Sequence, residues 1–322
     1  MNKPPVIFLM GPTAAGKTDL AIELVEKIPV DVISVDSTMV YRELNIGSAK
    51  PTPEELLKAP HQLIDIRDPS EPYSASEFCD DALSAIRRSH ENNRIPLLVG
   101  GTMMYFNVLL EGMADMPSAD AEVRRVIEVA AKQEGWPALH QQLKNIDPET
   151  AASLHPNHSQ RISRALEVYK LTGKTMTQLR REQHDSPASQ AKSFLNQFSV
   201  KQFAIGPRNR AVLHDRIKRR FHKMIENGFE QEVVSLRERG DLHLDLPAIR
   251  AVGYRQMWEY LQGQSSHDEM VEKGIAATRQ LAKRQLTWLR KWESLRWLYT
   301  EDEQGCEVNM SEICTLTLNY LD

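Results

Sequence analysis

The chain has 322 residues and a formal net charge of −4, from 40 Lys and Arg against 44 Asp and Glu. Hydrophobic residues make up 41% and charged residues 26%, which is typical of a globular protein with one large domain or two moderate ones. The overall acidity, taken alone, argues against a nucleic-acid binder. Apolar runs such as Val6–Met10 are shorter than a membrane span or the core of a secretion signal. We therefore expect a cytoplasmic protein without a membrane partner.

Strands and helices alternate over the first hundred residues. Three apolar runs have the length of buried strands, and a segment at helical spacing follows the first of them: the strands are Val6–Met10, Asp31–Val35 and Ile95–Val99, and the helix is Asp19–Lys27. This order predicts an α/β fold with a parallel sheet and flanking helices, of the P-loop NTPase-like type.

The middle of the chain reads as helices alone. Periodic segments cover Ala121–Gln133 and Ser159–Leu171, with Gly173 as a stop signal, and Asp147-Pro148 has the form of a helix start. Asp185–Ser199 reads as a linker. A strand at Lys201–Ile205 and helices at Asn209–Asn227, Pro247–Leu261 and His267–Trp292 complete the chain. We predict a core of residues 1–115 and 195–322, interrupted by an all-helical insertion at 116–194.

A phosphate-binding motif lies between the first strand and the first helix. Its residues are Gly11, Pro12, Thr13, Ala14, Ala15, Gly16, Lys17 and Thr18, which match G-x-x-x-x-G-K-[ST]. Backbone amides and the helix N-terminus would hold phosphate oxygens, Lys17 would add a positive charge, and the Thr18 hydroxyl would be a ligand for Mg²⁺.

Two further polar residues follow strand ends. Asp36 comes after the second strand, and Thr102 comes after Gly100-Gly101 at the end of the third. Because the carboxyl ends of parallel strands face the ligand crevice, both should face the phosphate loop. The sequence leaves three roles open for Asp36: contact with Mg²⁺, general base, or cap of the next helix.

Basic residues are concentrated in a few segments. Between Arg208 and Met224 there are seven basic residues against one acidic one, whereas residues 301–322 carry six carboxylates and no base. The helix His267–Trp292 carries a second basic face, and the insertion has Arg161 and Arg164 three residues apart. This pattern favours a polyanionic substrate in spite of the net charge. Arg220 is a candidate clamp for a small anion.

Taken together, these motifs resemble the tRNA dimethylallyltransferases, bacterial type. The resemblance rests on the phosphate loop, Asp36-Ser37, the segment Ile46–Pro51, Gly100-Gly101-Thr102, the segment Arg250–Gln256 and the segment Thr278–Gln285. It covers nearly the whole chain. Met39 and Ser48 depart from the residues common in the family, Gln and Thr, and the chain lacks the zinc finger of eukaryotic relatives.

The resemblance implies transfer of a dimethylallyl group from dimethylallyl diphosphate to N6 of adenosine 37, in tRNAs that read codons beginning with U. The implied catalytic residues are Asp36 as general base, Thr102, Thr13, Lys17 and Arg220. The implied tRNA contacts are Asp36, Ser37, Thr38, Met39, Thr102, Arg124, Gln160, Arg161, Ile162, Ser163, Arg164, Arg250, Ala251, Val252, Gly253, Tyr254, Arg255, Lys283, Arg284, Gln285 and Arg290. The expected cofactor is Mg²⁺, and the expected state is a monomer without an obligate protein partner.

Three other readings remain open. A small-molecule P-loop kinase would use the loop and Asp36, but it would leave the basic faces without a role. An RNA chaperone would use the basic faces alone. An adenylate isopentenyltransferase would share the chemistry, but it would not need the insertion.

Overall fold

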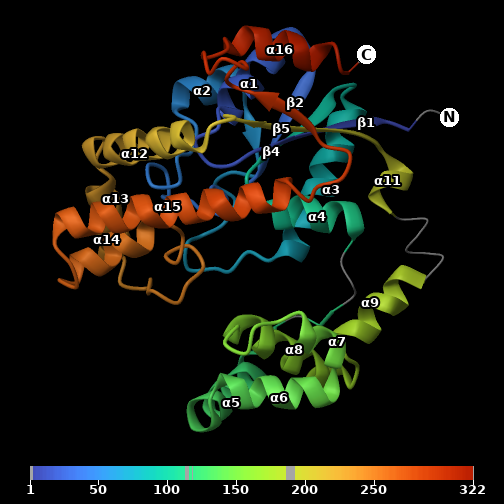
Figure 1. Cartoon of the computed structure of the whole chain (residues 1–322), viewed down its shortest axis with the longest axis vertical. Helices are drawn as coiled ribbons and strands as arrows, with labels where there is room; N and C mark the ends of the chain where they lie inside the picture. The colour runs from blue at the N-terminus through green and yellow to red at the C-terminus, as the bar shows by residue number, and fades with distance from the viewer. Residues whose placement is uncertain (1–2, 113–115, 118, 186–192, 322) are drawn as a thin grey trace. The chain divides into compact units, whose positions relative to one another are not determined.

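The computed structural model describes residues 3–112, 116–117, 119–185 and 193–321. The chain divides into two compact units, one formed by Met1–Leu109 with Phe198–Asp322 and the other by Leu110–Gln197. Figure 1 shows the elements of both units in chain order. We describe each unit by itself and call the first the catalytic unit and the second the helical unit.

The catalytic unit is built on a six-stranded sheet in the order β3-β2-β4-β1-β5-β6, in which every pairing is parallel. The strands are β1 (Pro5–Met10), β2 (Val30–Val35), β3 (His61–Gln62), β4 (Ile95–Gly100), β5 (Ser199–Gly206) and β6 (Arg296–Tyr299). The predicted α/β fold with a parallel sheet is confirmed, as are all four predicted strands. The edge strands β3 and β6 were not predicted.

Helices cover both faces of this sheet (Figure 1). They are α1 (Lys17–Lys27), α2 (Pro53–Lys58), α3 (Ala75–Glu91), α4 (Met103–Glu111), α12 (Arg210–Glu226), α13 (Phe229–Glu238), α14 (Tyr254–Leu261), α15 (His267–Leu289) and α16 (Met310–Leu318). One core cluster joins strand residues such as Leu9 and Leu97 to Leu20 of α1 and Ile313 of α16. The long helix α15 packs against α12 and α14, and it begins with a capping box formed by Ser266 and Glu269.

Three predicted boundaries were wrong. The helix expected over Pro247–Leu261 begins only at Tyr254, because Gly253 at φ +95° breaks the helical path before it. The helix expected to reach Trp292 ends at Leu289. In the predicted linker, Phe194–Gln197 forms the short helix α11 and Ser199 begins β5, while residues 186–192 lie outside the described part of the chain.

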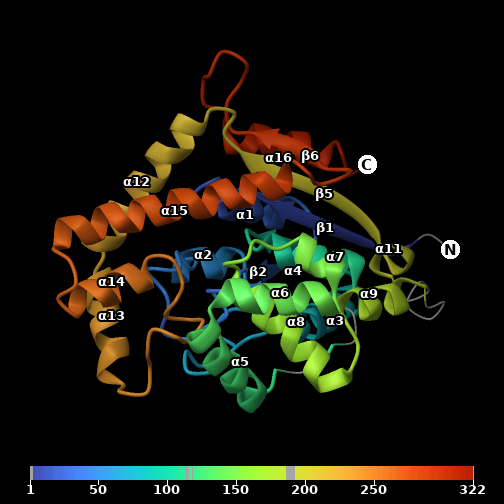
Figure 2. The same cartoon turned by 60° about the horizontal axis from the view of Figure 1, so that its bottom comes forward.

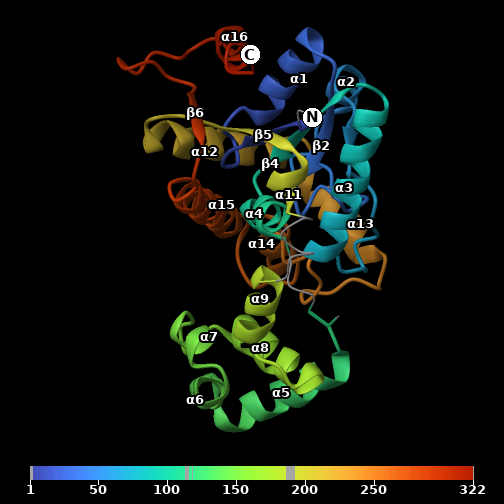
Figure 3. The ribbon, with the colours of Figure 1, turned by 90° about the vertical axis from the view of Figure 1, so that its right-hand side faces the viewer.

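The helical unit has a core of its own, formed by residues such as Ile127, Leu139, Leu143, Ile162 and Leu166. Its longer helices are α5 (Ala121–Glu134), α6 (Trp136–Ile146), α7 (Pro148–Ala152), α8 (Ser159–Thr172) and α9 (Met176–Asp185). α8 packs against α5 and α6 (Figures 2 and 3). The predicted start and stop signals are confirmed, because Asp147 caps α7 and Gly173 ends α8 at φ 70°. In the parts of the chain that the structure describes, no helix is both long and apolar enough to cross a membrane.

Candidate active site

Three neighbouring strands end level with one another at the carboxyl edge of the sheet. Gly100 at the end of β4 is in register with Met10 of β1 on one side and Val35 of β2 on the other. A Cβ at Gly100 would lie 2.0 Å from the backbone oxygen of Val35, so only glycine allows the strands to end side by side. The phosphate loop, Asp36 and Thr102 therefore emerge at one edge, as predicted.

The phosphate loop is supported from below by α15. The amide of Thr13 donates to Oε1 of Gln285 at 3.0 Å, and Nε2 of the same glutamine donates to the Gly101 oxygen at 2.8 Å. Ala14 at φ 62° and Gly16 at φ 92° place the loop in left-handed turns before α1 begins. One side chain thus joins the loop after β1 to the loop after β4.

Positive charge is concentrated where phosphate oxygens would bind. The ammonium of Lys17 donates to the backbone oxygens of Gly11 and Pro12 at 3.1 and 2.8 Å. Desolvation and the nearby Arg220 guanidinium lower the pKa of Lys17 to about 8, and Asp36 raises it in part. Burial also lowers the pKa of Arg220, against the opposite effect of carboxylates that include Asp36. An anion between these two cations would relieve their mutual repulsion.

Asp36 has a structural contact on only one of its oxygens among the hydrogen bonds described. Oδ1 accepts from the amides of Thr38 and Met39 at 2.8 and 3.2 Å, which fixes the turn after β2. Thr102 holds the same turn, because its Oγ1 accepts from the amide of Ser37 at 3.1 Å. The sequence left open a cap of the next helix, but the structure shows a cap of a turn, because the next helix begins only at Pro53. This contact orients the carboxylate without excluding chemistry at Oδ2.

A cavity of about 990 Å³ connects the phosphate loop, Asp36 and Arg220, whereas Thr102 is not among the residues that line it. Its polar lining includes Lys17, Thr18, Asp36 and Arg220, and its apolar lining includes Ile46, Ile217, Phe221, Val252 and Leu281. A charged end beside an apolar wall suits a ligand with a phosphate group and a short hydrocarbon chain. Every lining residue belongs to the catalytic unit.

The oxygen atoms that line the cavity could bind a magnesium ion whose other ligands are substrate phosphates and water. Among the described residues, no three His, Cys, Asp or Glu side chains gather into a metal-binding cluster. The Thr18 hydroxyl and the Asp36 carboxylate both line the cavity. Because Mg²⁺ keeps several waters and also binds substrate phosphate oxygens, the Thr18 hydroxyl is a suitable protein donor beside the diphosphate site.

Comparison with known proteins identifies the family. A family model described as IPP transferase matches residues 39–292. The full-length tRNA isopentenylpyrophosphate transferase of Bacillus halodurans is 36% identical, with a TM-score of 0.70 over 99% of this chain and 96% of that one. The tRNA isopentenylpyrophosphate transferase of Staphylococcus epidermidis is 31% identical, with a TM-score of 0.67 over 99% of this chain and 100% of that one.

The chain belongs to the IPP transferase family. A eukaryotic dimethylallyltransferase acting on tRNA is also similar, with 25% identity and a TM-score of 0.73 over 89% of this chain and 70% of that one. The family model begins at Met39, after the phosphate loop and Asp36, but the alignments to the two bacterial structures include almost the whole chain. The resemblance stated from the motifs is confirmed.

Three residues predicted from the family resemblance as tRNA contacts have buried side chains. Ile162 is 0% exposed in the core of the helical unit, and Gln285 is 8% exposed beneath the phosphate loop. Tyr254 is 0% exposed, and its hydroxyl donates to Glu232 at 2.7 Å. Ile162 and Tyr254 are thus packed and hydrogen-bonded inside their units, whereas Gln285 also lines the cavity.

The other predicted tRNA contacts include a set of exposed side chains. Arg255 among them forms an ion pair with Glu259 at 2.8 Å. The exposed residues are Ser37, Arg124, Gln160, Arg161, Arg250, Arg255, Lys283, Arg284 and Arg290. Ser163, Ala251 and Val252 are half-buried, and Gly253 is buried.

Two arginines of the helical unit form internal ion pairs. The carboxylate of Glu167, which is 0% exposed, accepts from Arg124 at 2.9 Å and from Arg164 at 2.7 Å. It also accepts from the amide of Asp120, and Arg164 donates to the Pro117 oxygen. These hydrogen bonds keep the pKa of Glu167 below its usual value in spite of burial. Arg164 and Glu167 thus bind Pro117 and Asp120 to α8.

The residue that sequence reasoning missed is Glu232 of α13. Its carboxylate accepts from the amides of Asn45, Ile46 and Gly47. A half-buried glutamate on an amphipathic helix has no distinguishing sequence signal, because its partners lie more than 180 residues away. The turn-rich segment Asn45–Lys50 was the only available hint, since its amides need partners from elsewhere.

Proposed function

We propose that this IPP transferase family member transfers the dimethylallyl group of dimethylallyl diphosphate to N6 of adenosine 37 in tRNAs that read codons beginning with U. The observation that carries the proposal is the convergence of a cationic phosphate loop and a strand-end carboxylate in one cavity with an apolar wall. The similar eukaryotic dimethylallyltransferase acting on tRNA supports the same acceptor.

The diphosphate is the leaving group. The backbone amides of residues 14–18, the ammonium of Lys17 and the guanidinium of Arg220 stabilise negative charge as the bond between C1 and the bridging oxygen breaks. The electron pair of that bond leaves with the diphosphate. The Thr13 side chain, in the phosphate loop, contacts the departing diphosphate. Thr18 would hold Mg²⁺, which would supply further charge neutralisation at the departing oxygens.

The acceptor amine needs a base, because its lone pair is delocalised into the adenine ring. Asp36 accepts a hydrogen bond from N6 and takes its proton as the bond between N6 and C1 forms. Thr102 positions the same amine, and by accepting from the amide of Ser37 it holds the turn that follows Asp36. Because the cavity lies at a strand edge, adenosine 37 is flipped out of its stack to enter it.

The exposed basic residues hold the rest of the tRNA. Arg161 and Gln160 of α8 contact the anticodon arm, and Lys283, Arg284 and Arg290 of α15 contact backbone phosphates. Since one chain supplies the whole cavity lining, we propose that the monomer is active.

A labelling assay tests this function. The protein is incubated with labelled dimethylallyl diphosphate and Mg²⁺, together with either unmodified tRNA or AMP. Label that enters tRNA and not AMP is the expected result, and replacement of adenosine 37 by guanosine should abolish it. Label that enters AMP would favour an adenylate isopentenyltransferase, and ATP-dependent phosphorylation without prenyl transfer would favour a kinase.

A further inference from the structure

One wall of the cavity is an irregular loop, and no sequence motif indicates which residues hold its backbone in place. Asn45, Ile46, Gly47, Ser48, Ala49 and Lys50 all line the cavity, and none of them belongs to a helix or strand. The backbone amides of such a segment need partners, or the loop would move toward solvent.

Glu232 and Tyr254 supply those partners. Oε2 of Glu232 accepts from the amides of Asn45 and Ile46 at 3.0 and 2.7 Å, and Oε1 accepts from the amide of Gly47 at 3.1 Å. The Tyr254 hydroxyl donates to Oε1 at 2.7 Å and accepts from the amide of Ser48 at 3.1 Å. Four consecutive amides are therefore held by one pair of side chains, and the carboxylate has all its usual acceptor positions filled.

Close packing keeps the loop at this position. A Cβ at Gly47 would lie 2.1 Å from Cε2 of Phe229 and 2.7 Å from Cζ of Tyr254. The rings of Phe229 and Tyr254 are themselves packed edge to face at 5.1 Å. The loop backbone thus rests directly on two rings and has no freedom to approach them further.

The loop leads from Glu232 to the diphosphate clamp. The backbone oxygen of Ala49, next after the four anchored amides, accepts from Nη2 of Arg220 at 3.3 Å. The Arg220 guanidinium is close enough to Lys17 to lower its pKa. A displacement of the loop would therefore remove the contact that orients Arg220.

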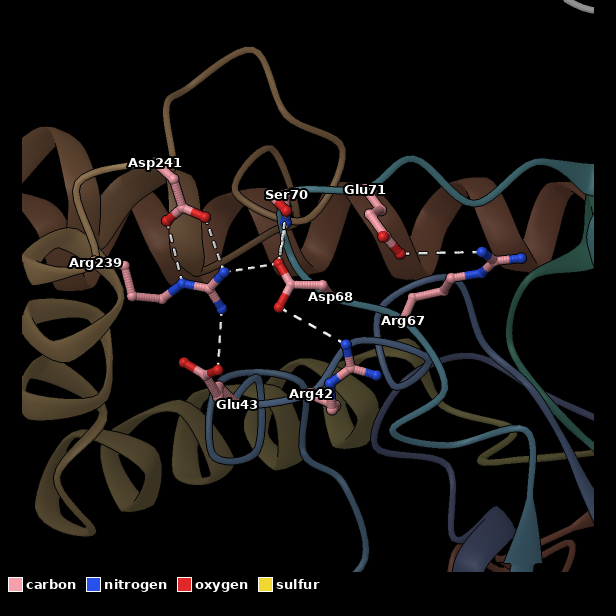
Figure 4. A network of polar contacts seen from close by, with 8 residues as sticks. All are labelled: Arg42, Glu43, Arg67, Asp68, Ser70, Glu71, Arg239 and Asp241. Atoms are coloured by element: carbon pink, nitrogen blue, oxygen red, sulfur yellow. Dashed lines mark hydrogen bonds and ion pairs between the residues drawn. The ribbon is translucent and has the colours of Figure 1, made fainter.

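A second anchor lies at the C-terminal cap of α13. Arg239 follows Glu232 by seven residues, or two helical turns. It contacts Glu43 at 3.0 Å, Asp68 at 2.7 Å and Asp241 at 2.9 Å, and Arg42 lies 3.8 Å from Asp68 (Figure 4). The segment before the loop is thereby tied to α13 as well.

We propose that Glu232 is a positioning residue for the diphosphate site, acting through residues 45–49 on Arg220. The inference rests on the proposed function in one respect, that Arg220 binds the diphosphate of the donor. The carboxylate is specifically required, because a side-chain amide at the same place would turn an NH₂ group toward the amide and hydroxyl donors that now bind an oxygen.

Binding of inorganic diphosphate to Glu232→Gln, measured calorimetrically well below the melting temperature, tests the proposal. We expect the affinity for diphosphate to fall about tenfold, because Arg220 loses the hydrogen bond to the Ala49 oxygen that orients it. Glu238→Gln is the matched control, since it makes the same change at an exposed position of the same helix and should leave binding unchanged. Because no prenyl transfer is measured, failure of the proposed activity would not affect this result.

A second variant keeps the test valid if Glu232→Gln does not fold. Tyr254→Phe retains the ring that packs on Gly47 but removes the hydroxyl, and we expect diphosphate binding to weaken about threefold. In the double variant the two effects should be less than additive, because both act on the same loop. A lowered melting temperature with unchanged diphosphate affinity in both single variants would assign Glu232 to stability alone and overturn the proposal.

Discussion

Asp36 combines two tasks on the two oxygens of one carboxylate. Oδ1 caps the turn at Thr38 and Met39, and the other oxygen is the proposed base. A substitution by alanine removes both tasks and would mix a change of loop structure with a change of chemistry. Asparagine separates them, because its side-chain oxygen can still accept from the two amides while its amide nitrogen cannot accept a proton.

We predict that Asp36→Asn lowers kcat by about 10²–10⁴-fold, the usual contribution of a general base, with a change in tRNA Kd of less than about threefold. Single-turnover kinetics and filter binding measure the two quantities. Asp36→Ala should weaken tRNA binding more than Asp36→Asn does, since the turn at residues 36–39 loses its cap. Equal losses of kcat and tRNA affinity in Asp36→Asn would identify Asp36 as a binding residue.

The pH dependence of diphosphate binding should follow Lys17. With its pKa lowered to about 8, Lys17 is charged at pH 7 and mostly neutral at pH 9, so we expect affinity to fall by up to about tenfold over this interval. Lys17→Met should bind diphosphate weakly, and its affinity should not decrease between pH 7 and pH 9. The same variant shows how much of any change comes from titration of the diphosphate itself. A fall of the same size in Lys17→Met would exclude Lys17 as its origin.

The lowered pKa of Lys17 makes diphosphate affinity fall as pH rises, but it makes the stability of the ligand-free protein increase. Between pH 8 and the ordinary lysine value of 10.5, the unfolded chain holds a proton on Lys17 that the folded chain has released. The free energy of unfolding therefore gains a favourable contribution from this residue as pH rises through that window. Comparison of wild type with Lys17→Met by denaturant titration isolates the contribution from those of other groups.

At the scale of elements, α8 separates two kinds of arginine. Arg161 is exposed, and no contact of its guanidinium is described, whereas Arg164 is 28% exposed and bound to Glu167 and to the Pro117 oxygen. Sequence spacing treats the pair alike, because both lie near one helix face. Only the position of Glu167, one turn after Arg164 and buried, distinguishes a surface charge from an internal one.

Arg161→Ala and Arg164→Ala should therefore differ. We expect Arg161→Ala to reduce the slope of log Kd for tRNA against log salt by about 0.7–0.9, one phosphate contact, without changing stability. Arg164→Ala should destabilise the helical unit by about 2 kcal/mol, because the buried Glu167 loses one of its two charged partners. Salt-dependent tRNA binding and thermal unfolding measure these effects. A lower stability in Arg161→Ala together with an unchanged stability in Arg164→Ala would contradict the structure.

The sheet and its ligand edge were accessible from sequence because strong local signals marked them. The glycine motif follows a strand, and Asp36 and Gly100 follow two others. The short strand β6 and the helices α13 and α16 were missed because their stability comes from packing against the rest of the unit. Gln285 was expected to contact tRNA because of the family resemblance, and its hydrogen bond with Thr13 could not be predicted because it joins residues 272 positions apart.

For the whole molecule, the net charge proved a poor guide because the acidic tail and the basic helix α12 partly neutralise each other. Arg216 pairs with Glu307 at 2.9 Å, and the amide of Asn209 donates to Glu301 at 3.0 Å. Exposed charges such as Lys218 and Lys223 remain on α12. Local arrangement decides which charges are available to an RNA backbone.

The division into two units predicts separable binding functions. Because the cavity is lined by the catalytic unit alone, a chain in which a short Gly/Ser linker replaces residues 116–192 should bind inorganic diphosphate within about twofold of the full chain. Its tRNA affinity should fall at least about tenfold through loss of the contacts on α8. Calorimetry and filter binding test this, with a cooperative melting curve as evidence of folding. A folded variant that no longer binds diphosphate would contradict the division.

The strand order β2-β4-β1 also fixes a length. Asp36 follows β2 and the phosphate loop follows β1, with β4 between them, so the two are separated by two strand spacings, or about 10 Å. The Asp36 carboxylate and the loop amides face this space from the two strand ends, so a substrate group held between them can meet both. Because β4 lies between β2 and β1, it sets the separation between Asp36 and the phosphate loop. A donor with a longer hydrocarbon tail would not change this separation, but it would need a deeper apolar wall in the cavity.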